Sequence, residues 1–297
     1  MKAALLHDRG VVKVAGDDAR KFLNGLITSD TARIDPAHAA FAALLTPQGK
    51  IIADFIVAEA EPTDGGGFFL DCPRALAPTL VQRLNFYKLR AKVIIEDLCE
   101  ILGVMAIWEG MPADGKHGLC YADPRLSELG TRCMLPPQRA AQAAAALGAE
   151  LRDSLAYEAH RIAHAIPRGG LDFIYGDAFP HETDMDQLRG VDFAKGCFVG
   201  QEVVSRIEHR GTARTRVVAV RFDGFAPEPG TPVSAGQKPV GTLGSTSERR
   251  GLAMLRLDRV TEALAAGEQL AAGGIALRAF RPHWARFAFP GDPAARP

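Results

Sequence analysis

A thiol, an ammonium, an amide and a carboxylate stand close together in one short stretch of this sequence. Residues 193–202 read Phe-Ala-Lys-Gly-Cys-Phe-Val-Gly-Gln-Glu, with Lys195 two residues before Cys197 and Gln201 four residues after it. Apolar residues recur at helical spacing after Gly200, so we expect a helix to begin there. A helix N-terminus and a nearby ammonium both favour the thiolate form of a cysteine. The stretch predicts a reactive thiol at Cys197, assisted by Lys195; the alternative is a small buried cysteine.

A carboxylate lies inside an apolar segment that reads as a strand. Asp54 is the only charged residue of the run Ile-Ile-Ala-Asp-Phe-Ile-Val at residues 51–57. A carboxylate in such a strand must face solvent, a partner group or a cavity. Asp54 is therefore a candidate ligand contact, with an outward-pointing surface position as the alternative.

The stretch Lys-Gly-Cys-Phe-Val-Gly-Gln-Glu at residues 195–202 resembles the hallmark of the YgfZ family, relatives of the aminomethyltransferase (T protein) of the glycine cleavage system. Residues 22–30, 45–50 and 166–170 also resemble that family and occur in its order. The resemblance covers most of the chain. It implies a T-protein-like arrangement of three domains, in which two α+β domains form a folate cleft and a β-barrel follows at the C-terminus.

The resemblance also implies a site for tetrahydrofolate or another reduced folate. In the T protein a glutamate holds the pterin, and Glu182 matches its position. A carboxylate can accept two parallel N–H bonds from a pterin, and Tyr175 could pack against an aromatic ring. Gln201 and Arg206 are further candidate folate contacts, the arginine for the glutamate tail. The alternatives are a helix cap for Glu182 and a solvated helix face for Arg206.

Two functions are compatible with these residues. The first is a folate-binding accessory protein in assembly or repair of iron–sulfur enzymes, as the YgfZ resemblance implies, with Cys197 as the working thiol. Its partners would be client iron–sulfur enzymes or cluster-assembly proteins. The second is a folate-dependent aminomethyltransferase, methyltransferase or demethylase that uses Asp54. The T protein has two consecutive aspartates in the corresponding strand, whereas this chain has Ala53-Asp54. The lost aspartate and the Lys-Gly-Cys motif favour the accessory protein.

The surrounding elements mix helices and strands without strict alternation, which favours an α+β fold. Helices are expected near residues 74–89 and 154–165. After residue 215 short apolar runs recur between glycine-rich turns, which is typical of a small closed β domain. We expect residues 1–210 to form two interwoven α+β domains and residues 211–297 to form a small β-barrel.

Composition narrows the functional classes further. The 297 residues carry a formal net charge of +0, so no overall field attracts nucleic acid or an anionic membrane. The five cysteines are widely spaced and include no Cys-x-x-Cys pair, which argues against a disulfide framework and against an autonomous metal or cluster site. No stretch has the pattern of a signal peptide or a membrane-spanning helix. We expect a soluble protein in a reducing compartment, the cytoplasm, with no nucleic-acid or membrane partner.

Overall fold

The structure is a computed structural model, and it describes residues 1–110, 117–211 and 213–291. The chain divides into two compact units. Unit 1 contains Met1–Tyr157 and Leu188–Gln201, and unit 2 contains Glu158–Gln187 and Glu202–Pro297. The boundaries between these units differ from the domain boundary expected between residues 210 and 211. That domain boundary stays a prediction.

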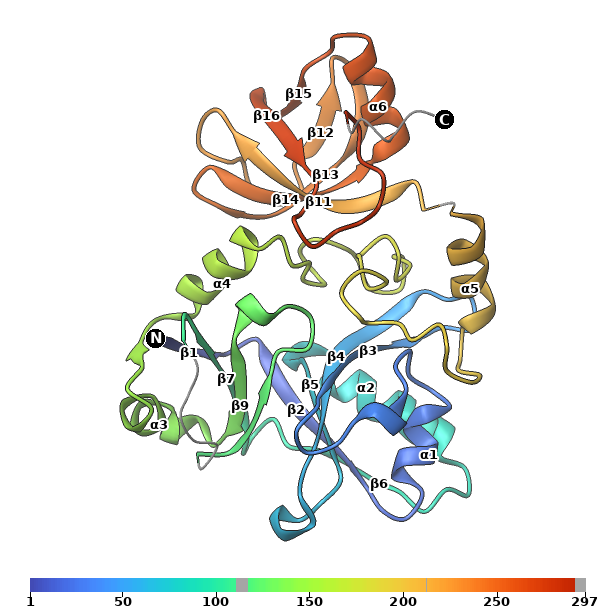
Figure 1. Ribbon diagram of the computed structural model, residues 1–297, viewed down its shortest axis with the longest axis vertical. Coiled ribbons are helices and arrows are strands. Elements are labelled where there is room, and N and C mark those ends of the chain that lie inside the picture. Colours follow the sequence, from blue (N-terminus) through green and yellow to red (C-terminus); the bar gives the residue numbers. More distant parts are fainter. Residues whose placement is uncertain (111–116, 212, 292–297) are drawn as a thin grey trace. The chain divides into compact units, whose positions relative to one another are not determined.

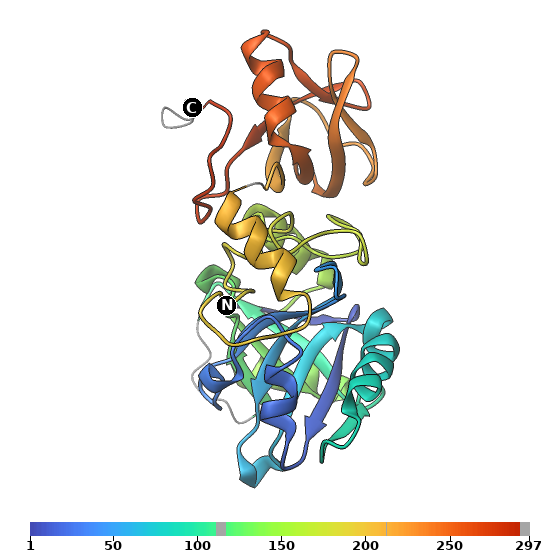
Figure 2. The same ribbon diagram turned by 90° about the vertical axis from the view of Figure 1, so that its right-hand side faces the viewer.

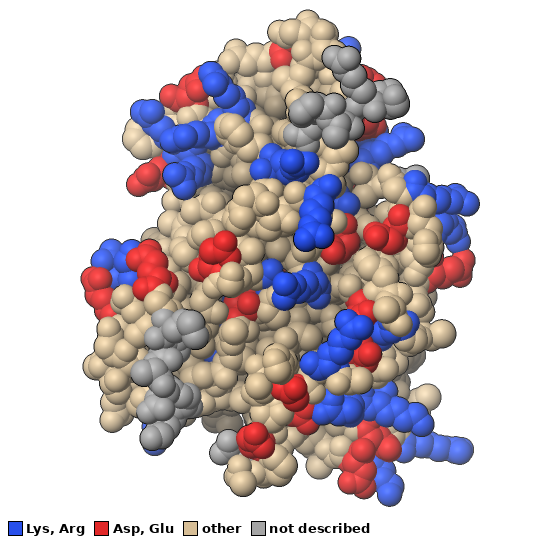
Figure 3. Space-filling model, in the orientation of Figure 1, with Lys and Arg blue, Asp and Glu red and all other residues tan. Residues whose placement is uncertain are grey.

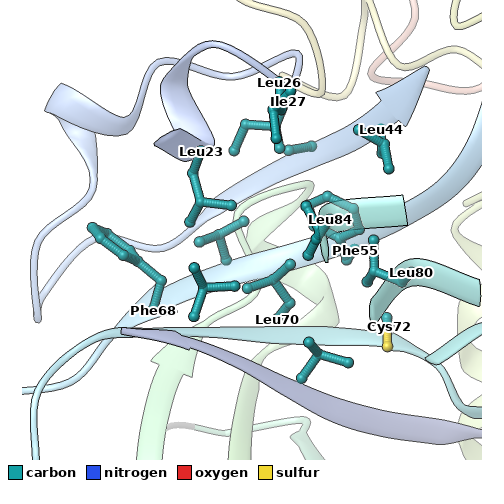
Figure 4. Close-up of a cluster of buried hydrophobic side chains, with 14 of the residues drawn as sticks. Leu23, Leu26, Ile27, Leu44, Phe55, Phe68, Leu70, Cys72, Leu80 and Leu84 are labelled. Carbon is teal, nitrogen blue, oxygen red and sulfur yellow. The ribbon is translucent and has the colours of Figure 1, made fainter. Parts of the chain in front are cut away.

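The first sheet of unit 1 carries most of its hydrophobic core on one face. Its strand order is β3-β4-β5-β2-β6, all neighbours antiparallel. Apolar side chains of this face pack against two helices, because Leu23 of α1 and Leu80 and Leu84 of α2 belong to the same buried cluster (Figure 4). Figure 2 shows α2 in teal against these strands. The elements are β2 (Arg9–Ala15), α1 (Ala19–Asn24), β3 (Ala40–Leu45), β4 (Ile51–Glu59), β5 (Phe68–Pro73), α2 (Ala77–Lys88) and β6 (Ile94–Asp97).

The second sheet of unit 1 has the order β10-β1-β7-β9-β8. Its outer face packs on α3, since Ala140, Ala143 and Ala144 share a buried cluster with Met105 and Ile107. Alanines let the helix approach the strands closely. The elements are β1 (Lys2–Leu6), β7 (Gly103–Trp108), β8 (Leu119–Ala122), β9 (Thr131–Leu135), α3 (Ala140–Ala146) and β10 (Glu150–Leu151).

A buried charge network joins the facing sides of these two sheets. Asp71 on β5 accepts hydrogen bonds from Arg9 (2.6 Å), from Arg132 on β9 (2.7 Å) and from the Tyr121 hydroxyl on β8 (3.0 Å). Arg132 also donates to Asp123 at 2.9 Å. Burial acts to raise the pKa of Asp71, but the charges of Arg9 and Arg132 outweigh it, so the pKa is lowered. The network is therefore ionised and tightly paired.

Unit 2 contains a closed six-stranded β-barrel (Figure 1). The strands close in the order β11-β14-β13-β12-β15-β16, and α6 packs on the barrel core through Val260 and Ala263. The barrel confirms the fold expected for the C-terminal part. Its elements are β11 (Thr215–Phe222), β12 (Pro232–Ala235), β13 (Lys238–Ser247), β14 (Arg250–Arg256), α6 (Leu257–Ala265), β15 (Leu270–Ala272) and β16 (Ile275–Phe280).

The rest of unit 2 is rich in loops. The helix α5 spans Gln201–Arg210, and α4, which begins in unit 1, spans Ser154–Ala163. Arg161 at the end of α4 donates to Asp172 at 2.9 Å and to the Ser245 hydroxyl on β13 at 2.6 Å. These buried bonds fasten the irregular segment 164–187 to the barrel.

Cysteine pairing differs from the expectation. Cys120 on β8 and Cys133 on β9 stand directly opposite each other and form a disulfide. The sequence argued against a disulfide framework and did not predict this single bridge, while Cys72, Cys99 and Cys197 are unpaired. The two residues are thirteen apart, and only the strand register brings them together.

Candidate functional site

The loop that carries Cys197 is fastened to unit 1 by Lys195. The Lys195 ammonium is buried and donates to three backbone carbonyls, those of Asn24 (2.8 Å), Ile27 (2.7 Å) and Ser29 (3.0 Å). An ammonium has three N–H donors, so all of them are used. Burial lowers the pKa of Lys195 to about 8, with Asp30 and Asp192 acting in the opposite direction. The structure therefore gives Lys195 an anchoring position, where the sequence suggested assistance to the thiol.

Gly200 provides a second fastening point. Its φ of +83° lies in the left-handed region. A Cβ there would stand 2.6 Å from the Thr46 carbonyl oxygen and 3.1 Å from the Gly49 Cα, so only glycine fits. Lys195 thus binds the segment 22–30 and Gly200 packs on the turn 46–49. Three stretches that resemble one family in the sequence meet in one place in unit 1.

Cys197 is held at the surface by its neighbours. Lys195 and Phe198 are buried on either side, with the ammonium 5.1 Å from the Phe198 ring centroid, and Cys197 is exposed. The other unpaired thiols, Cys72 and Cys99, are buried, and burial raises the pKa of Cys99 to about 11. The expectation that Cys197 is exposed is confirmed, and the buried alternative is wrong. Its reactivity stays a prediction.

Asp54 is buried within unit 1. It lies on β4 opposite Ala43 of β3, and only 6% of the residue is exposed. It faces away from the helix-covered core, on the same side of the sheet as Asp71, and its charge acts to raise the pKa of Arg9. The outward-pointing alternative is therefore wrong. Asp54 adjoins the buried charge network between the two sheets.

Tyr175 belongs to the loop segment of unit 2. Its ring covers Gly169, where any side chain would collide with the ring atoms. The ring also makes an edge contact with Phe173 at 5.3 Å between centroids. Tyr175 therefore closes its own loop onto the Pro-Arg-Gly-Gly stretch, and the proposed stacking on a ligand ring remains a prediction.

Glu182 lies in a pocket of unit 2 with a volume of about 370 Å³. One carboxylate oxygen accepts the backbone N–H of Phe179 at 2.8 Å. This bond closes a turn, and no helix begins near Asp184 in the structure. The pocket is lined by one carboxylate, two arginines, a histidine and mostly apolar neighbours: Phe179, His181, Glu182, Ile207, Ala213, Arg214, Thr215 and Arg256.

The candidate cation Arg206 does not line this pocket. Arg206 is exposed on α5 and pairs with Glu202 at 2.6 Å, as the solvated-face alternative requires. Gln201 is the first residue of α5 and its N–H donates to the Phe198 carbonyl at 3.2 Å. Arg214 and Arg256 line the pocket instead. Arg256 comes from β14, so only the closure of the barrel reveals it.

A second polar group of unit 2 adjoins this pocket. His181, Asp186 and Glu208 each offer a possible metal-ligating atom, and these atoms lie within 4.8 Å of one another. Asp186, however, is already held by the Arg216 guanidinium through two bonds of 2.6 and 3.0 Å. A divalent cation would have to displace that arginine from Asp186. We therefore interpret His181, Asp186 and Glu208 as part of an ion-pair cluster and not as a metal site.

The fold resembles that of a known enzyme. The chain is similar to the glycine cleavage system aminomethyltransferase T of Bartonella henselae, with a TM-score of 0.73 over 97% of this chain and 87% of that one, at 14% identity. At that identity the likeness shows the fold alone. Residues 214–287 match the family described as "CAF17, C-terminal beta-barrel domain". The protein is thus of the T-protein fold with a barrel of the CAF17 type.

Sequence relatives define the family more narrowly. The chain is 36% identical over 233 residues to the "Iron-sulfur cluster assembly factor IBA57 homolog, mitochondrial" of Mycosarcoma maydis, covering 74% of this chain and 57% of the relative. It is 30% identical to the IBA57 protein of Mus musculus and 29% identical to that of Homo sapiens, each over 86% of this chain and 77% of the relative. The chain belongs to the IBA57 family, whose named members are iron–sulfur cluster assembly factors.

These comparisons correct one expectation and leave another open. The relatives are named as mitochondrial proteins, which points to the mitochondrion and contradicts the expected cytoplasmic location. The relation to the YgfZ family still rests on the motifs. Among the described residues, no helix has both the length and the apolar character needed to cross a membrane.

Proposed function

We propose that this protein is an iron–sulfur cluster assembly factor in which Cys197 supplies a thiolate to iron of the cargo cluster. The observation that carries the proposal is the exposed thiol on a loop fixed at Lys195 and Gly200. Iron–sulfur clusters take cysteine thiolates as ligands, and a cluster needs several. Since Cys197 is the only exposed cysteine among the described residues, the remaining ligands must come from a partner protein that carries or receives the cluster.

The fixed loop matters to this chemistry. A flexible thiol must lose conformational freedom on each encounter with a cluster, whereas a preorganised one has already lost it. Lys195 and Gly200 hold the backbone on both sides of Cys197, so the thiol is presented in one arrangement. Two clusters of backbone groups, the carbonyls of segment 24–29 and the turn 46–49, supply that rigidity.

We propose further that the pocket around Glu182 binds a reduced folate, whose pterin N–H donors match a carboxylate. Its volume of about 370 Å³ lies within the range of small-molecule sites. The Glu182 oxygen that does not accept from Phe179 can accept from a pterin, and Arg214 can pair with a carboxylate of a glutamate tail, whereas Arg256 already pairs with Asp258. The donor set therefore fits such a ligand.

The thiol is tested by labelling. At neutral pH a thiol reagent should modify Cys197 quickly, and Cys72 and Cys99 only after unfolding, because both are buried. The variant Cys197→Ser should lose the fast phase, and Cys99→Ser should keep it. A slow Cys197, or a fast phase that survives Cys197→Ser, would contradict the proposal.

The folate pocket is tested by calorimetry with tetrahydrofolate. Glu182→Gln replaces an acceptor by an amide that faces pterin donors, at a cost of about 1–3 kcal/mol of binding free energy. The matched change Glu61→Gln, at an exposed position of unit 1, should leave the affinity unchanged. Absence of binding by the parent protein would remove the folate site and leave the thiol proposal standing.

Aminomethyl or methyl transfer is the competing function. The T-protein fold alone suggests it, and its carboxylate would be Asp54. Cys197 has no evident role in moving a one-carbon unit on a folate. Turnover of an aminomethyl donor with tetrahydrofolate by the purified protein, abolished in Asp54→Asn, would establish this function in place of cluster assembly.

A further inference from the structure

A row of arginines crosses three neighbouring strands on the outside of the barrel. Arg221 on β11 stands directly opposite Arg250 on β14 and directly opposite Arg278 on β16. All three are exposed, and we call them the arginine row. In the space-filling view, Lys and Arg atoms gather over one side of the barrel with a few acidic atoms beside them (Figure 3).

The row is unusual because its guanidiniums form no ion pair with the part of the chain that the structure describes. Over residues 1–110, 117–211 and 213–291, no side chain forms an ion pair or hydrogen bond with these guanidiniums. Directly opposed side chains on neighbouring strands have Cβ atoms about 5 Å apart, and like charges in such pairs destabilise the sheet. The fold gains nothing from this arrangement, so it is compatible with a role for the row outside the fold.

Two features beside the row resemble a protein-binding surface. Arg221 and Arg250 line a pocket of about 270 Å³ together with Arg249, Glu248 and Phe225. Phe225 is 77% exposed although it is large and apolar. Arginine and aromatic residues are the types most enriched at the centres of protein interfaces.

We propose that the arginine row binds an acidic segment of a partner protein. Guanidiniums pair with carboxylates bidentately, and acidic residues at alternate positions of an extended segment lie about 7 Å apart, within reach of neighbouring arginines. An apolar residue of the segment would contact Phe225. The row belongs to unit 2 and Cys197 to unit 1, and this proposal does not depend on the role proposed for the thiol.

Charge around the row favours a short acidic segment over a polyanion. Glu248 lines the same pocket, and Asp223 is exposed directly after β11. A nucleic acid or an anionic membrane is held by many cations over a wide surface, and carboxylates within that surface repel it. The formal net charge of +0 adds no long-range attraction for either.

The experiment measures binding of a fluorescein-labelled peptide of alternating glutamate and threonine to the full-length chain by fluorescence anisotropy. The parent protein should bind it in a salt-sensitive manner and should not bind the matching glutamine–threonine peptide. Arg221→Gln with Arg278→Gln should weaken binding about tenfold. The matched pair Arg83→Gln with Arg90→Gln, exposed on α2 and just after it, should bind as the parent does.

A folded state of the double variant is checked by its far-ultraviolet circular dichroism. Arg221→Lys, which keeps the charge and loses the bidentate geometry, should weaken binding by about threefold. The proposal is overturned if the parent protein does not bind the glutamate peptide, or if it binds the glutamine peptide equally well. It is overturned as well if the double variant binds the glutamate peptide as tightly as the parent protein does. It is also overturned if single-stranded DNA or vesicles of phosphatidylglycerol bind more tightly than the peptide.

Discussion

The two compact units differ in how completely some of their charged side chains are paired. In unit 1 the buried Arg132 lies between Asp71 and Asp123, and the buried Lys195 is surrounded by three carbonyls. In unit 2 the buried Asp184 and Arg216 keep one carboxylate oxygen and the Nε without a hydrogen-bond partner among the described residues. The arginine row of unit 2 likewise has no ion-pair partner among the described residues. Arg132 and Lys195 of unit 1 are thus fully paired, whereas Asp184, Arg216 and the arginine row of unit 2 keep groups without such a partner.

The difference also appears in the pKa directions. Burial acts to raise the pKa of Asp123, but Arg125 and Arg132 outweigh it and lower the pKa below the ordinary range. Burial raises the pKa of Asp184 well above the ordinary range, because Arg216 opposes it only in part and the charge of Asp186 adds to it. Two buried aspartates of one chain thus have pKa values shifted in opposite directions. The internal pairing of unit 1 suits a scaffold for the Cys197 loop.

Removal of Arg132 is expected to have the largest effect. Arg132→Met leaves Asp71 and Asp123 buried with fewer partners, which should lower the free energy of unfolding by about 3–5 kcal/mol. Arg139→Met at an exposed position should change it by less than about 0.5 kcal/mol. Urea denaturation measures both. A loss below about 1 kcal/mol in Arg132→Met would show that the network of unit 1 is not tightly coupled.

The anchor at Lys195 comes next. Lys195→Met keeps an unbranched apolar side chain but leaves three buried carbonyls without their donor, at a cost of about 2–3 kcal/mol in unfolding free energy. Lys21→Met, on the exposed side of α1, serves as the control. Equal stability of the two variants would mean that the Cys197 loop is held by other contacts.

The pH dependence of stability separates the two units. Because the pKa of Asp184 is raised, the folded state holds a proton that the unfolded state releases above the ordinary pKa of 3.8. Stability attributable to Asp184 therefore falls as pH rises above about 4, by at most about 1.4 kcal/mol per pH unit. Asp71 and Asp123 have lowered pKa values, so their contribution is lost as pH falls below that range.

The variant Asp184→Asn isolates the contribution of Asp184, in unit 2, to the pH dependence of stability. An asparagine imitates the protonated carboxyl that the raised pKa of Asp184 favours in the folded state, and it cannot titrate. Thermal melting from pH 5 to pH 8 should show a decline in the parent protein that this variant lacks. An unchanged pH profile would show that Asp184 is ionised in the folded protein.

The smallest expected effect concerns the arginine row. Arg221→Gln removes the central charge of two opposed like-charge pairs and should raise the free energy of unfolding by about 0.5 kcal/mol. The same change at Arg83 should leave it unaltered. If Arg221→Gln instead lowered the free energy of unfolding, Arg221 would have a stabilising partner in the fold. That result would contradict the difference in charge pairing between the two units.

Much of the scaffold could be predicted from the sequence. The repeated short strands indicated the barrel, and the motifs at residues 22–30, 45–50 and 195–202 indicated the family. The exposure of Cys197 was expected from the neighbouring Lys195 and from the helix that begins just after it. These features depend on local sequence, which is why they were accessible.

The remaining details depend on contacts that leave no local pattern. Lys195 was expected to face the thiol, but its acceptors are backbone carbonyls. Every residue has a backbone carbonyl, so the sequence does not show which ones accept a hydrogen bond. Arg256 reaches the Glu182 pocket only because β14 closes the barrel. The pairing of Cys120 with Cys133 depends on the register of two strands. Burial of Asp54 likewise follows from the packing of the second sheet.

The role of Cys197 is tested most directly by complementation in the native host. A strain that lacks the protein is supplied with the parent chain or with Cys197→Ser, and the activity of several iron–sulfur enzymes is measured. A serine hydroxyl keeps the volume but stays protonated and binds iron poorly. We predict that Cys197→Ser leaves these activities near the level of the deletion, although the protein is folded and its tetrahydrofolate affinity is unchanged. Full restoration by Cys197→Ser would show that the exposed thiol has no part in cluster assembly.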